Sequence, residues 1–134
     1  MPIDHSKLAV GQEVSAHSIT LDREAVSRYV DAVDDRSSIP VRDGEAAIVP
    51  PMAVAALSLG AVITDLQIPP QTLHMRQELE FNGAVRIGQS VRCKAHVAQN
   101  TVRRGTRLLT VEMEVDDESG NRVLSGKGTI VFPE

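Results

Sequence analysis

Aromatic residues are nearly absent from this chain of 134 residues, which has no tryptophan, one tyrosine and two phenylalanines. Its core therefore has to be packed from valine, leucine, isoleucine and alanine. Cysteine is equally scarce, because Cys93 stands alone and rules out an internal disulfide. The amino terminus lacks the basic segment followed by an apolar one that marks a secretory signal, so we expect a cytoplasmic protein.

Clustered positive charge is missing as well. The formal net charge is −4, and the lysines and arginines are scattered, whereas a nucleic-acid surface needs a basic face. The histidines show no spacing typical of metal ligands; they are His5, His17, His74 and His96. We therefore expect no nucleic-acid partner, no metal and no cofactor.

A stretch without any charged residue lies between Glu45 and Asp65, and the pair Pro50-Pro51 opens its most apolar part. Proline is tolerated in the first turn of a helix, where its missing N–H would have no partner, so the pattern predicts a helix from about Pro51 to about Asp65. A helix this apolar is typical of one buried on all sides. It is shorter than the about 20 apolar residues that a bilayer requires, so we expect no membrane span.

Alternating apolar and polar residues predict strands at residues 13–20, 73–81, 90–98, 107–115 and 122–132. In the second of these strands the alternation places His74 on the polar face, and in the third it places Cys93 in the apolar row as a structural residue. Glycines inside the last strand, Gly126 and Gly128, suggest a tightly curved sheet.

A shorter helix precedes the apolar one. Apolar residues share one helical stripe at Val26, Tyr29, Val30 and Val33, with Thr20 or Asp22 as the cap. Together these elements predict an α+β hotdog fold, in which a curved antiparallel sheet wraps around one long apolar helix. The length fits a single domain over residues 1–134.

Four segments carry a resemblance to a known family: residues 29–35 (YVDAVDD), 48–52 (IVPPM), 73–81 (LHMRQELEF) and 85–90 (VRIGQS). In order and spacing they resemble the MaoC-like hotdog hydratases and dehydratases of acyl thioesters, in particular the amino-terminal half of fused dehydratases. The resemblance implies reversible addition of water to a 2-enoyl thioester of coenzyme A or acyl carrier protein, in fatty acid or polyketide metabolism. It also implies a homodimer, or a heterodimer with a second MaoC-like protein.

In active members of that family, an Asp and a His five residues apart move the proton of the catalytic water. Carried over, Asp35 matches the Asp, but the His position holds Pro40, which can neither accept nor donate a proton. The resemblance further implies a substrate-binding wall made by Tyr29 and by the helix start, at Pro50, Pro51, Met52 and Ala53. The helix N–H groups would bind the thioester oxygen, although Pro51 removes one of them.

Other interpretations stay open. Asp35 can equally cap or neutralise its loop, because surface carboxylates are most often solvated. Hotdog thioesterases and bacterial fatty-acid dehydratases place a carboxylate on the central helix, where this chain offers only Ser58 and Thr64, so both readings are weakened. Two hypotheses remain. The first is an enzyme subunit whose partner supplies the missing His. The second is a non-catalytic thioester-binding or scaffold protein, or a related enzyme re-tasked in a secondary pathway.

Overall fold

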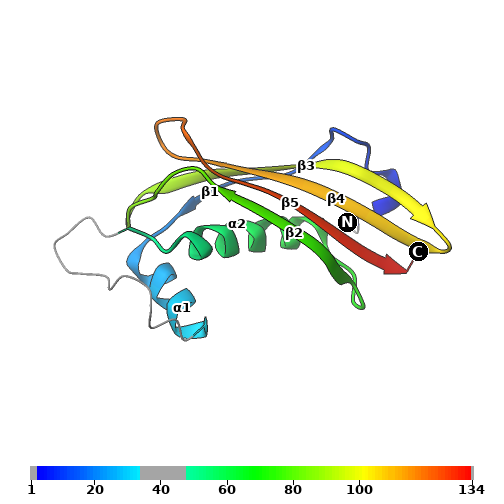
Figure 1. The fold of residues 1–134 in the computed structure, drawn as a ribbon, viewed down its shortest axis with the longest axis horizontal. Coiled ribbons are helices and arrows are strands. Elements are labelled where there is room, and N and C mark those ends of the chain that lie inside the picture. Colours follow the sequence, from blue (N-terminus) through cyan, green and yellow to red (C-terminus); the bar gives the residue numbers. More distant parts are fainter. Residues whose placement is uncertain (1–2, 34–47, 134) are drawn as a thin grey trace.

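The computed structural model of the chain describes residues 3–33 and 48–133. Its elements are η1 (His5–Lys7), β1 (Glu13–Thr20), α1 (Arg23–Val33), α2 (Pro51–Leu66), β2 (Leu73–Phe81), β3 (Ser90–Arg103), β4 (Thr106–Asp116) and β5 (Arg122–Pro133). The five strands form one antiparallel sheet in the order β1-β3-β4-β5-β2. The sheet arches over α2, and α1 lies near the start of α2 (Figure 1).

The helix α2 matches its predicted bounds but not its predicted burial. The residues that face the sheet are buried, at Ala53, Val54, Ala55, Ser58, Val62 and Leu66. Elsewhere on the helix Ala56 is exposed, and Met52 and Ile63 keep 51% and 44% of their surface. The prediction of burial on all sides is therefore wrong for the single chain, because one sheet covers only one side of the helix.

Aliphatic side chains fill the space between helix and sheet, as the composition predicts. Phe132 is the aromatic residue among the buried core residues, and Cys93 is fully buried with its Sγ 3.8 Å from the carbonyl oxygen of Ser58. Burial raises the pKa of the Cys93 thiol to about 11. The prediction that Cys93 is a structural residue is confirmed by this position.

The amphipathic helix α1 is capped by one of the two residues predicted for that role. The backbone N–H of Ala25 donates to Asp22 Oδ1 at 2.8 Å, which identifies Asp22 as the capping residue. Val26 is fully buried and Tyr29 is half-buried against the core. None of the helices in the described ranges has the length and apolar character needed to cross a bilayer.

A β-bulge in β2 changes which side chains face the helix. Register shifts between His74 and Arg76, so that His74 pairs with Ile130 and Gln77 pairs with Gly128. Since Ile130 and Gly128 line the space above α2, His74 and Gln77 lie on the same, concave face of the sheet. The prediction that His74 lies on the polar face is wrong, because the extra residue reverses the alternation.

Candidate functional site

A cavity of about 200 Å³ lies between the C-terminal half of α2 and the concave face of the sheet. Most of its lining is aliphatic, from Leu59, Val62, Ile63, Leu66, Ile68, Val111, Met113 and Ile130. Thr72, His74 and Gln77 add polar groups along β2 and the turn before it. Such a mainly apolar space with a few convergent polar groups is typical of a small-molecule site.

Two glycines of β5 form part of the cavity wall on the sheet side. A Cβ atom at Gly128 would lie 2.8 Å from Gln77 Oε1 and 3.5 Å from His74 Nε2. A Cβ atom at Gly126 would lie 3.1 Å from Leu79 Cδ2. The bare backbone at these positions therefore makes room for side chains of β2, a more particular role than the sheet curvature that the sequence suggested.

The side-chain amide of Gln77 has a defined orientation. Its Nε2 group donates to the carbonyl oxygen of Glu78 at 3.3 Å and lies 3.5 Å from that of Lys127. Because a carbonyl oxygen needs a donor, these two neighbours place the NH₂ group toward the backbone and Oε1 over Gly128. No hydrogen bond to Oε1 is formed within the described part of the chain, so it is an available acceptor at the cavity.

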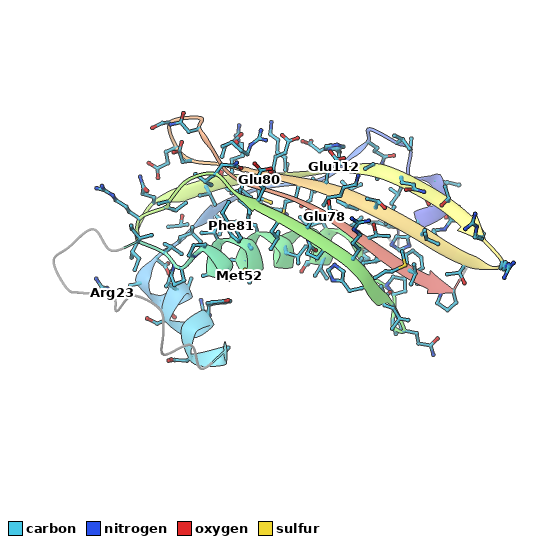
Figure 2. The ribbon with its side chains drawn as sticks, viewed as in Figure 1. Arg23, Met52, Glu78, Glu80, Phe81 and Glu112 are labelled. Atoms are coloured by element: carbon cyan, nitrogen blue, oxygen red, sulfur yellow. The ribbon has the colours of Figure 1, made fainter. Side chains whose placement is uncertain are left out.

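The other three histidines do not line this cavity. His5 Nε2 lies 2.7 Å from the carbonyl oxygen of Leu66, His17 Nε2 lies 2.6 Å from Asp65 Oδ2, and His96 Nε2 lies 3.2 Å from Glu112 Oε2. Glu112 is on the side of the sheet away from α2 (Figure 2). Within residues 3–33 and 48–133, no three His, Cys, Asp or Glu side chains gather as metal ligands would.

The predicted helix-start residues occupy a different place. Pro50 is half-buried, Pro51 and Met52 are exposed, and Ala53 is fully buried. The Ala53 N–H donates to the carbonyl oxygen of Pro50 at 2.8 Å, whereas the Met52 N–H forms no hydrogen bond to any described residue. Of the Met52 and Ala53 N–H groups at the helix start, that of Met52 is thus the one still available to a thioester oxygen.

A small cavity of about 60 Å³ adjoins this helix start. Pro51 lines it together with Ile48 and Val49 from the preceding loop, and Phe81 closes it from the end of β2. Figure 2 shows Met52 and Phe81 toward the same end of α2. Tyr29, on α1, lines neither this cavity nor the larger one. The predicted catalytic residue Asp35 and the substituted position Pro40 lie outside the described residues.

Sequence reasoning missed His74 and Gln77 as site residues. Gln77 was nevertheless marked in the sequence, because it is the one polar residue in the alternate row of Leu73, Met75, Leu79 and Phe81. A lone polar residue in an apolar row often faces a ligand or a cavity. His74 carried no such signal, since its orientation depends on the bulge.

Comparisons of the sequence with known proteins find a matching family and a similar protein. The family described as FAS1-like, dehydratase domain region matches residues 8–125. A UPF0336 protein of Saccharopolyspora erythraea is 30% identical in an alignment that covers 98% of this chain and 92% of that protein.

Solved structures agree on the fold. The (R)-hydratase PhaJ1 of Pseudomonas aeruginosa has a TM-score of 0.77 at 21% identity, over 99% of this chain and 87% of that one. The HadBC complex of Mycobacterium tuberculosis, a 3R-hydroxyacyl-ACP dehydratase, gives 0.69 at 14% identity, over 90% of this chain and 98% of that one. The predicted α+β hotdog fold is confirmed by this likeness.

Proposed function

Since the chain belongs to the FAS1-like dehydratase domain region family of MaoC-like hotdog proteins, we propose that it holds the acyl part of a 2-enoyl or 3-hydroxyacyl thioester while a second hotdog chain supplies the catalytic histidine. The observation that carries the proposal is the mainly aliphatic cavity beside α2, which suits an acyl chain. The carrier of the thioester is coenzyme A or acyl carrier protein.

The proposed reaction is the reversible addition of water across the carbon–carbon double bond. The water oxygen bonds to C3 while the water loses a proton, and C2 gains a proton; dehydration is the reverse. Asp35 would accept a hydrogen bond from this water and orient it. Pro40 cannot transfer the proton, so the imidazole that does so belongs, in this proposal, to the partner chain.

Negative charge develops on the thioester oxygen when C2 takes up or releases its proton. A backbone N–H at the start of a helix stabilises such a charge, because the donor is free and the helix dipole is favourable there. The Met52 N–H meets this requirement, since it forms no hydrogen bond to a described residue. We assign the thioester oxygen to this position.

The edge strand β2 is the surface we propose for the partner chain. Among residues 3–33 and 48–133, β5 is the strand that pairs with it, on one side, and its apolar residues are open to solvent: Leu73, Met75 and Phe81 keep 68%, 59% and 44% of their surface. An unpaired edge with exposed apolar side chains invites another strand. The likeness to HadBC, itself a complex, supports pairing between hotdog chains, as a homodimer or a heterodimer.

The test is hydration of crotonyl-coenzyme A by the purified chain, alone and mixed with a MaoC-like protein whose loop holds an Asp and a His five residues apart. We expect no enzyme-like rate from the chain alone and a rate in the mixture above that of the partner alone. Asp35→Asn should lower the rate of the mixture if Asp35 orients the water, with Glu112→Gln on the outer face of the central strand β4 as the matched control. Full activity of the isolated chain would overturn the proposal.

A second candidate is a non-catalytic thioester-binding protein, which the loss of the histidine at Pro40 favours. It predicts that acyl-coenzyme A binds the chain but that no hotdog partner gains hydratase activity from it. Calorimetric binding combined with the same mixing assay separates the two functions.

A further inference from the structure

The polar end of the cavity carries an inference that rests on the proposed function and goes beyond it. We propose that His74 and Gln77 form a hydroxyl-binding site inside the acyl cavity, so that the preferred thioester carries a hydroxyl group on its acyl chain, remote from the thioester. The juxtaposition of these two side chains over Gly128 is the observation behind it.

The two side chains converge on one point. Gln77 Oε1 lies 2.8 Å, and His74 Nε2 3.5 Å, from the place where a Cβ of residue 128 would stand. A ligand atom cannot occupy this place, which is one bond length from the Cα of Gly128, but the two distances show that Gln77 Oε1 and His74 Nε2 lie no farther apart than their sum, and both side chains line the cavity. One hydroxyl oxygen between the two atoms can therefore lie within hydrogen-bond distance of both.

The chemistry of the pair selects the ligand group. Gln77 Oε1 is an acceptor without a partner in the described part of the chain, because Nε2 already donates to the backbone. A neutral imidazole nitrogen either donates or accepts. A hydroxyl group does both, so it can donate to Gln77 and accept from His74. A ketone or an ester carbonyl only accepts, and it would leave Gln77 Oε1 unpaired.

The rest of the lining explains why such a pair matters. Leu59, Val62 and Ile130 offer an alkyl chain no polar contact, so the pair, with the hydroxyl of Thr72 nearby in the lining, is the polar end of an otherwise apolar wall. In the single chain both side chains are exposed along the open β2 edge. Once the proposed partner covers that edge, they lose water, and an alkyl chain would leave them unpaired at a cost that a hydroxyl avoids.

The position along α2 sets the place of the hydroxyl. Val62, one of the α2 residues that line the cavity, follows Met52 by ten residues, which is about 15 Å of helix and roughly the reach of a twelve-carbon acyl chain. With the thioester oxygen at the Met52 N–H, the hydroxyl bound by His74 and Gln77 lies near the far end of such a chain. It is therefore distinct from the hydroxyl on C3 that the reaction removes.

The experiment is titration calorimetry of the chain together with its hotdog partner, using dodecanoyl-, 3-hydroxydodecanoyl- and 12-hydroxydodecanoyl-coenzyme A. We expect 12-hydroxydodecanoyl-coenzyme A to bind about fivefold to tenfold more tightly than dodecanoyl-coenzyme A, the gain of one well-placed hydrogen bond. Gln77→Leu and His74→Phe should each remove this preference while dodecanoyl-coenzyme A still binds. Glu112→Gln, on the outer face of the central strand β4 and away from the proposed partner edge, is the control and should keep it.

The outcomes separate this proposal from the proposed function. Equal affinity for dodecanoyl- and 12-hydroxydodecanoyl-coenzyme A overturns the hydroxyl site and leaves the acyl cavity standing. A preference found only for 3-hydroxydodecanoyl-coenzyme A overturns the proposal that the bound hydroxyl group is remote from the thioester. Failure of all three to bind overturns the proposed function itself. Circular dichroism of each variant shows whether the fold is intact.

Discussion

His17 on β1 and Asp65 in the last turn of α2 join the edge of the sheet to the helix, with Nε2 of the histidine 2.6 Å from Oδ2 of the carboxylate. The hydroxyl of Ser15, which is almost fully buried, donates to the same oxygen at 2.8 Å. The hydrogen bond from Ser15, and then that from His17, hold the pKa of Asp65 below its usual value of 3.8. This cluster anchors the end of the helix beside the cavity.

Replacing Asp65 by asparagine should destabilise the protein at neutral pH by about 1 kcal/mol, a modest figure because the carboxylate is partly exposed. A carboxyl whose folded pKa is depressed stabilises the fold above its unfolded pKa, and this contribution is lost as the pH falls through the folded pKa. Urea unfolding at pH 7 and at pH about 3 should thus show a smaller difference between variant and parent at the acid pH. An equal difference at both would contradict this role.

Neighbouring alanines of α2 provide a matched pair of substitutions. Ala55 keeps 3% of its surface and faces the sheet, whereas Ala56 is exposed. Ala55→Asp should unfold the protein or lower its melting temperature severely, because it buries an unpaired charge. Ala56→Asp should leave the fold nearly as stable as the parent. Thermal unfolding monitored by circular dichroism compares the melting temperatures of the two variants. A similar loss of melting temperature in both would mean that the outer face of α2 is also covered.

Cys93 should be inert in the folded protein. Its side chain is fully buried and its pKa is raised to about 11, so little thiolate exists and none is accessible near neutral pH. An aromatic disulfide reagent at pH about 8 should react with it only after urea unfolds the chain. Rapid reaction of the native protein would show that the sheet opens locally over α2.

The open edge of β2 should hold two chains together. Met75→Lys places a charge on this edge, where lysine is known to discourage strand pairing, and Met52→Lys on α2 is a control of similar exposure. Light scattering should give the parent and Met52→Lys a mass above 14.5 kDa, and Met75→Lys a mass near 14.5 kDa. A parent that is already monomeric at micromolar concentration would refute the pairing.

The element bounds were largely predictable because each rests on a local pattern. The charge-free run with its prolines defined α2, and alternation defined β1, β2, β4 and β5 to within a residue or two. The third strand was the exception, because it was predicted to end at residue 98 and β3 continues to Arg103. The added residues are mostly polar, and they are held in the sheet by pairing with β4. There the chain reverses at Arg104 and Gly105, both with positive φ, which suits a tight hairpin turn.

The candidate site was less predictable because it depends on contacts between distant segments. The orientation of His74 follows from a bulge that exists only relative to β5, and the exposure of Ala56 follows from which side of α2 the sheet covers. The cavity itself joins α2 to strands that come later in the chain. Asp35 remains a prediction, since it lies outside the described residues.

The strand order also bears on how the chain folds as it is synthesised. The pairs β3–β4 and β4–β5 join neighbours in sequence, whereas β1 pairs with β3 across α1, α2 and β2, and β2 pairs with β5 across the two strands between them. Because non-local pairings form slowly, we expect the hairpins of β3, β4 and β5 to come first. The apolar helix α2 leaves the ribosome before any of these three strands exists to cover it. Until they follow, it is the segment most in need of a chaperone.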